Sequence, residues 1–157
     1  MIFKTTTKLV LDNRARDWCK LPYPDHPKGC PNYGKKQGCP PQAPLVGDYF
    51  NLNEDHYFVV VQFDLGKHIE RMKNKHPSWS DRQAKCVLYW QGGVNKALRE
   101  ECQFYVAQQG GLVYNLCPEA MGVNVIKTCK AMGLPIKLRP TDTVFKVGML
   151  GTMKPLL

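Results

Sequence analysis

Residues 56–64, HYFVVVQFD, form a run of β-branched and aromatic side chains that predicts a buried strand. The next segment, LGKHIERMKNKH, carries Leu65, Ile69 and Met72 at the spacing of a helix, and a proline follows it. We therefore expect a strand and a helix, joined directly, as the first clear unit of the fold.

The same alternation continues on both sides of this unit. Upstream, TKLVLD (7–12) predicts a short strand. Downstream, Ser80 and Gln83 predict a capping box that opens a long amphipathic helix reaching Val106, with a kink at residues 92–93. The pattern then predicts a strand at 112–116, a helix from Pro118 to about Met132 capped by Gly133, and a strand at 142–150. Because strands alternate with helices, we expect one small α/β domain over residues 1–157, with a mostly parallel sheet flanked by helices.

The composition is that of an ordinary globular protein, with 43% hydrophobic and 22% charged residues. No apolar run approaches the ~18 residues that a membrane-spanning helix needs, and the N-terminus shows no secretory signal. We therefore expect a cytoplasmic protein. Its net charge of +9 would attract polyanions such as RNA or DNA.

Three cysteines lie in a segment where burial as hydrophobic side chains is not expected. Residues 13–47 hold seven of the twelve prolines, and this composition predicts a loop. Within it, Cys19, Cys30 and Cys39 follow a C-x10-C-x8-C spacing. Irregular backbone brings thiolates together from several directions, as a metal centre requires. The segment is therefore a candidate metal-binding loop.

The spacing favours an iron–sulfur cluster over a single zinc ion. Structural zinc sites usually include a tight C-x2-4-C pair, which these three cysteines lack, although His26 would complete a Cys3His set. Unligated or redox-active thiols are the third interpretation. Because the seven cysteines are an odd number, a complete disulfide framework is not expected.

The other four cysteines have different contexts. Cys86, Cys102 and Cys129 fall on apolar stripes of predicted helices, where cysteine behaves as a small hydrophobic residue. Cys117 lies where a predicted strand ends and a helix begins, a common location for sites in α/β proteins. It is a candidate fourth metal ligand or a reactive thiol beside the metal, and a purely structural role stays open.

Three motifs together carry a resemblance to a known family. They are GCPNYGKKQGCPP (29–41), PEAMGVNVIKTCKAMGLPI (118–136) and DTVFKVGMLG (142–151). In this pattern the chain is similar to domain-of-unknown-function family 2284, a group of predicted metal-binding, cysteine-rich proteins, over most of its length. The resemblance implies a cysteine-bound metal, most simply a 4Fe–4S cluster, on Cys19, Cys30 and Cys39. Members of that family usually carry a further group of cysteines before the second motif, where this chain has only Cys117.

Basic and aromatic residues surround the candidate metal-binding loop. From residue 14 to 36, six Lys and Arg stand against two Asp, a net charge of +4. Cations among aromatic rings can bind nucleic acid, and we take the following residues as candidates for that role: Arg14, Arg16, Lys20, Lys28, Tyr33, Lys35 and Lys36. The four histidines show no catalytic spacing, and we expect His68 and His76, on or near a basic helix, to be solvated.

The sequence thus predicts a protein that binds one 4Fe–4S cluster through Cys19, Cys30 and Cys39, with Cys117 as candidate fourth ligand. If one iron lacks a protein thiolate, it is an open Lewis-acid site. The basic surroundings would then favour an enzyme that inserts or removes sulfur on a nucleotide or RNA substrate. Three alternatives stay open: a regulatory or binding module in which a structural cluster supports contact with nucleic acid or a protein, an electron carrier, and a structural zinc protein.

Overall fold

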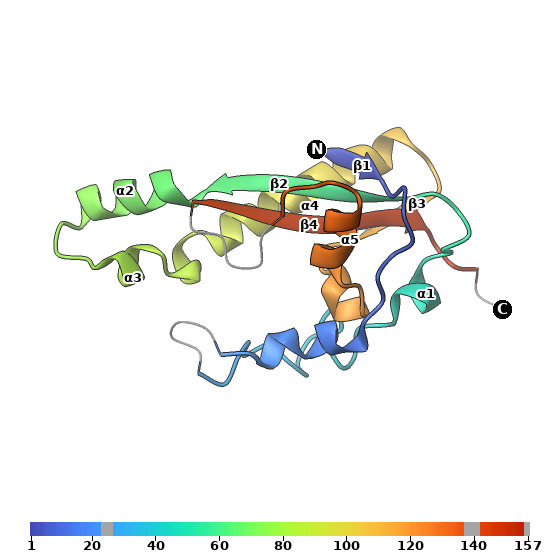
Figure 1. The fold of residues 1–157 in the computed structure, drawn as a ribbon, viewed down its shortest axis with the longest axis horizontal. Helices are drawn as coiled ribbons and strands as arrows, with labels where there is room; N and C mark the ends of the chain where they lie inside the picture. Colours follow the sequence, from blue (N-terminus) through green and yellow to red (C-terminus); the bar gives the residue numbers. More distant parts are fainter. Residues whose placement is uncertain (23–26, 137–141, 156–157) are drawn as a thin grey trace.

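The fold is centred on a four-stranded sheet in which every neighbouring pair is antiparallel. The computed structural model describes residues 1–22, 27–136 and 142–155 (Figure 1). The strands are β1 (Ile2–Lys4), β2 (His56–Asp64), β3 (Leu112–Asn115) and β4 (Thr143–Thr152), in the order β1-β2-β4-β3. The expected mostly parallel sheet is therefore wrong, whereas the strand at 56–64 and the final strand are confirmed.

The sheet is antiparallel because of the position of β4. The helix α2 (Leu65–Lys75) continues beyond the end of β2 (Figure 1), and the longer helix α4 (Gln91–Gln108) then leads to β3, which runs in the same direction as β2. These two strands are not neighbours, since β4 lies between them and is antiparallel to both. β2 then pairs with β4 along its whole length, from His56 opposite Gly151 to Asp64 opposite Thr143. Both strands are largely apolar, and such runs specify burial without specifying direction.

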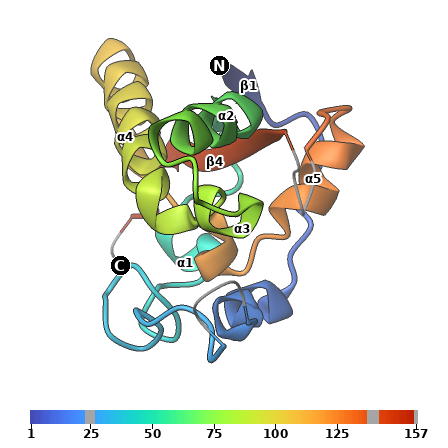
Figure 2. The same cartoon turned by 90° about the vertical axis from the view of Figure 1, so that its left-hand side faces the viewer.

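Two hydrophobic cores lie on opposite faces of the sheet. On one face, Phe58, Val60 and Met149 pack against residues of α5 (Val125–Ala131) and of α1 (Val46–Tyr49). On the other face, Val59, Val61 and Leu150 pack against α4 (Gln91–Gln108). Figure 2 shows α4 and α5 on either side of the sheet. Cys102 and Cys129 are completely buried, one in each core, which confirms that they act as small hydrophobic residues.

The long helix expected from Ser80 onward is divided. The predicted capping box is present and opens only α3 (Asp81–Ala84). A short 3-10 helix, η2 (Val87–Tyr89), follows before α4 begins. The indole nitrogen of Trp90 donates to the carbonyl of Lys85, 3.1 Å away, and so binds a carbonyl where α3 ends. Cys86 is buried as expected, but it lies in this break rather than on the stripe of a helix.

The helix expected from Pro118 is divided as well. It consists of η3 (Pro118–Met121) and α5, separated by Gly122 at a φ of 90°. Asn124 caps α5 by accepting a hydrogen bond from the backbone N–H of Lys127 at 3.0 Å. Gly133 follows α5 at a φ of 78°, in agreement with its predicted role as a cap.

Upstream of β2, the chain lies mostly outside the sheet. The strand expected at 7–12 is absent, since only Leu11 forms a bridge, with Val123. We call residues 13–45 the N-terminal ribbon. It begins with the 3-10 helix η1 (Asn13–Lys20), which packs against η3, and it lies below the sheet in Figure 1. Its turns contain the expected metal-binding loop.

None of the helices in the described part of the chain is both long enough and apolar enough to cross a membrane.

Candidate metal centre

Cys19 and Cys30 are held side by side by their backbones. Cys19 lies in the last turn of η1, and the N–H of Cys30 donates to its carbonyl oxygen at 2.6 Å. Gly29, at a φ of 84°, makes this approach possible, because a Cβ at that position would lie 2.4 Å from the same oxygen. Only glycine fits here, so the Gly-Cys pair in the sequence has a structural reason.

Turns around Cys39 fold the next part of the ribbon. The N–H of Cys39 donates to the Lys36 carbonyl at 3.0 Å, and the Cys39 carbonyl accepts from the N–H of Ala43 at 2.9 Å. Gly34 exchanges two further contacts with this turn. Its N–H donates to the Pro40 carbonyl, and its carbonyl accepts from the Gln42 side-chain amide, both at 2.7 Å. Cys39 is therefore fixed by local hydrogen bonds.

Arg16 joins the segments that carry three of the four candidate ligands. Its guanidinium donates to three backbone carbonyls, those of Ala120 at 3.0 Å, Pro41 at 3.0 Å and Ala43 at 2.6 Å. Arg16 itself precedes Cys19 on η1, whereas the carbonyls belong to the segments of Cys39 and Cys117. One arginine side chain thus ties the ribbon to η3.

The pKa shifts of the thiols also indicate that they are neighbours. Burial raises the pKa of Cys19, and the neighbouring Cys30 and Cys39 raise it further. Burial and the adjacent Glu119 raise the pKa of Cys117 to about 12, with a smaller contribution from Cys19. Cys19 is therefore within electrostatic reach of the other three thiols, and all four are free and partly exposed. We call Cys19, Cys30, Cys39 and Cys117 the thiol site.

Two charged residues at the thiol site were not found from the sequence. Glu119 accepts a hydrogen bond from the thiol of Cys117 at 3.6 Å, and burial raises the pKa of its carboxyl group. Lys146, on β4, opposes the raised pKa values of Cys19, Cys117 and Glu119. Both residues lie inside motifs quoted above, Glu119 in PEAMG and Lys146 in VFKVG. For Glu119 the available signal was its position, two residues after the candidate ligand Cys117.

The thiols gather without forming a ready-made ion site. In the described ranges, no three His, Cys, Asp or Glu side chains are arranged so that they could hold a metal ion. His26, the candidate fourth zinc ligand, lies outside the described residues. Binding at the thiol site would thus require its side chains to turn towards a common centre and to lose their protons.

The candidate nucleic-acid-binding residues have varied surroundings. Arg14 forms an ion pair with Asp12 at 2.9 Å. Lys20 pairs with Asp17 at 3.3 Å and lies 4.8 Å from the centre of the Tyr33 ring. The guanidinium of Arg16 is bound to the backbone, as described above, which indicates a structural role for it. Three lysines of the ribbon are exposed: Lys28, Lys35 and Lys36.

One histidine departs from the expected solvated state. His68 is only 4% exposed, because α2 places it against the Phe63 ring, at a centroid distance of 5.5 Å. His76 is partly buried and stacks on Trp79 at 4.1 Å. The expectation of solvated side chains is therefore wrong for His68.

The comparisons with known proteins add no assignment. No family model matches the chain, and neither the curated proteins nor the solved structures contain a match. The resemblance to domain-of-unknown-function family 2284 stays a prediction.

Proposed function

We propose that the protein binds a 4Fe–4S cluster through Cys19, Cys30, Cys39 and Cys117. One observation carries the proposal. The side chain of Arg16 and the backbone hydrogen bond from Cys30 to Cys19 together connect the segments of these four cysteines. The residues are far apart in the sequence, yet the polar contacts that join them centre on one region. This is the convergence that a thiolate-bound cluster needs.

The chemistry of the donor set supports iron and sulfide. Four cysteine thiolates are the usual ligands of 4Fe–4S clusters. The positive charge of Lys146, together with the exposed lysines of the ribbon, would offset the negative charge of a thiolate-bound cluster. A reducing compartment keeps thiols available for metal, so the proposal includes a cytoplasmic location.

Four protein thiolates would leave no open coordination position, and we propose a stabilising role for the cluster. The described part of the ribbon contains turns, one 3-10 helix and few core side chains, so bonds from a metal centre would add substantially to its folding free energy. A closed cluster also suits an electron carrier, whereas an enzyme with an open iron requires that Cys117 is not a ligand. A structural zinc on the same thiols is the remaining alternative.

Exposed lysines on the ribbon favour a polyanionic partner as a second proposal. Lys28, Lys35 and Lys36 are exposed on the same segment as Tyr33. A cluster that stiffens the ribbon would fix these groups for contact with RNA or DNA. Binding that weakens steeply as salt rises, and that needs Lys35 and Lys36, would support this partner.

Anaerobic reconstitution of single-cysteine variants tests the proposal. Each of Cys19→Ser, Cys30→Ser, Cys39→Ser and Cys117→Ser should lose the cluster or bind it weakly, as seen in the visible absorption of iron–sulfur centres. Cys102→Ala removes a fully buried thiol from the core beside α4 and should keep the cluster. If Cys117→Ser keeps a complete cluster, an open iron is supported and the stabilising role fails. If Cys102→Ala loses the cluster as the four serine variants do, or if all five variants keep it, the thiol site is not the metal centre.

A further inference from the structure

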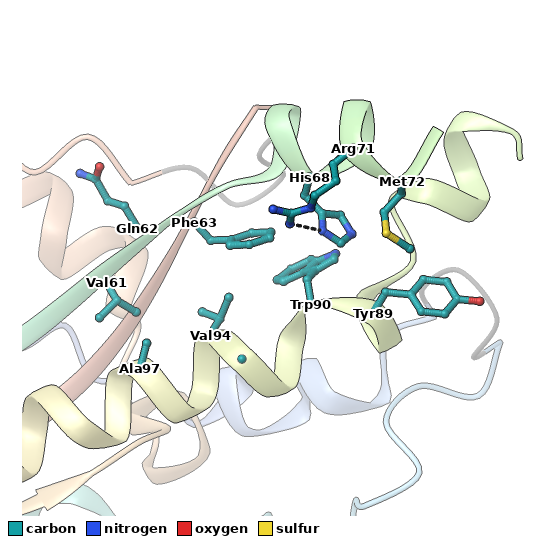
Figure 3. Close-up of a pocket in the computed structure, with 11 residues that line it drawn as sticks. Val61, Gln62, Phe63, His68, Arg71, Met72, Tyr89, Trp90, Val94 and Ala97 are labelled. Atoms are coloured by element: carbon teal, nitrogen blue, oxygen red, sulfur yellow. Dashed lines mark hydrogen bonds between the residues drawn. The ribbon is translucent and has the colours of Figure 1, made fainter. Parts of the chain in front are cut away.

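A second, unrelated site lies between the end of β2, α2 and the start of α4. It is a cavity of about 470 Å³, a size typical of small-molecule sites, which span roughly 300–1,000 Å³. Figure 3 shows Phe63, His68, Met72 and Trp90 pointing towards one another, with Tyr89 beside them and Gln62 directed away. Its described lining contains no cysteine, so the cavity is separate from the thiol site.

The aromatic walls are fixed before any ligand binds. The Trp90 and Phe63 rings are stacked, with centroids 5.2 Å apart and planes 16° apart. The hydrogen bond from the Trp90 indole to Lys85 holds the first of these rings in place. Tyr89, 52% exposed, presents a further aromatic surface at the edge of the cavity. Such preformed apolar walls favour a flat, apolar ligand body.

His68 holds the Arg71 guanidinium at the cavity. Its Nδ1 lies 3.4 Å from that guanidinium, which can only donate, so Nδ1 accepts and the proton resides on Nε2. Nε2 is buried from solvent and makes no hydrogen bond in the described structure, although the Ala84 backbone is near enough to favour the protonated ring. A ligand therefore does not reach Nε2, whereas the exposed side chain of Arg71 lines the cavity.

The charge at the cavity is positive. Burial and the neighbouring Arg71 both lower the pKa of His68, so its ring is held neutral and the guanidinium carries the charge. No Asp or Glu is found among the described lining residues. An anionic ligand is therefore favoured over a cationic one.

We infer that this cavity binds a small aromatic carboxylate. The aromatic ring lies against Trp90 and Tyr89, and the carboxylate accepts hydrogen bonds from the guanidinium of Arg71. His68 orients that guanidinium from the protein side through its Nδ1.

Three probes separate the parts of this inference: phenylacetate, its neutral analogue phenylacetamide, and acetate, which has charge without a ring. Titrations of the full-length, ¹⁵N-labelled protein are followed by NMR at the imidazole nitrogens of His68 and the indole N–H of Trp90. We expect saturable shifts at both with phenylacetate, and at least roughly tenfold weaker binding of the other two probes. Equal binding of all three, no binding of phenylacetate, or shifts confined to other residues would overturn the inference.

A matched pair of variants on α2 completes the test. Arg71→Gln should weaken phenylacetate binding by roughly tenfold or more, because it removes the charged donor that faces the carboxylate. Lys67→Gln removes the same charge one turn earlier on the same helix, away from the cavity lining, and should leave the affinity unchanged. An equal loss of affinity in both variants would mean that phenylacetate is attracted non-specifically to a basic helix, and it would contradict a specific binding site in the cavity.

Discussion

The sheet and the N-terminal ribbon are stabilised by different kinds of interaction. β2 pairs with β4 at nine successive positions, and its central residues are buried on both faces. The ribbon instead depends on turns, on Arg16 and on one close backbone contact between Cys30 and Cys19. Hydrophobic burial therefore folds the sheet, whereas the ribbon relies on a few polar contacts and, in our proposal, on a cluster. The two parts should respond differently to the same kind of damage.

The largest effect is expected in the sheet. Phe58 is fully buried in the core between the sheet and α5. Phe58→Ala should lower the free energy of unfolding by about 3–5 kcal/mol, through lost burial and the cavity left behind. Urea denaturation followed by circular dichroism measures this loss. A change below about 1 kcal/mol would contradict the view that this core folds the protein.

Removal of Arg16 should loosen the ribbon and spare the sheet. Arg16→Ala deletes three hydrogen bonds from a charged donor, and we expect the ribbon to open more easily by about 2 kcal/mol. Hydrogen exchange should therefore speed up at the amides of Cys30 and Gly34 and stay unchanged at Val60. Arg14→Ala, which breaks only the exposed pair with Asp12, is the control. If hydrogen exchange at these amides speeds up equally in both variants, Arg16 does not hold the ribbon together.

Two glycines of the ribbon offer a matched comparison. Gly29 and Gly34 both have positive φ, but a Cβ at Gly29 would clash with backbone, whereas one at Gly34 meets nothing within 4 Å. Each change to alanine should cost roughly 1–2 kcal/mol of local backbone strain. Gly29→Ala should in addition separate Cys30 from Cys19, and so reduce metal uptake where Gly34→Ala does not. Equal uptake by the two variants in the reconstitution assay would contradict the proposed geometry.

The smallest expected effect is a loss of stability at acidic pH through His56 in the sheet. Burial lowers the pKa of His56, on β2, below its ordinary value of 6.5, so the unfolded chain binds more protons than the folded protein near that pH. The contribution of His56 to the free energy of unfolding is complete above pH 6.5 and declines as the pH falls below that value. The urea midpoint should fall between pH 7.5 and pH 5.5, and fall less in His56→Gln. Identical decreases in the two proteins would contradict this role for His56.

The predictions from sequence were most accurate where local pattern decides the structure. The strand HYFVVVQFD, the helix after it and the capping box at Ser80 all follow from spacing and side-chain type. The direction of the sheet does not, because it depends on the insertion of β4 between β2 and β3. The breaks before Trp90 and at Gly122 likewise involve a local side-chain hydrogen bond and a backbone angle, neither of which a helical stripe reveals.

The same distinction applies to the thiol site. Cysteine spacing in a proline-rich segment was enough to select Cys19, Cys30 and Cys39, and the position before Pro118 selected Cys117. Arg16 and Lys146 act on Ala120 and Cys19 across more than a hundred residues of sequence, so no local pattern indicated them. Glu119 lies only two positions after Cys117, and this local signal was not used. His68 was expected in solvent because its neighbours on α2 are charged, but Phe63 and Trp90 cover that face of the helix.

The metal and acid-labile sulfide content of anaerobically purified, full-length protein tests the central claim most directly. The account predicts iron and sulfide in equal amounts, roughly four of each per chain, and their loss in Cys19→Ser. One zinc per chain without sulfide, or no metal under any anaerobic condition, would contradict it.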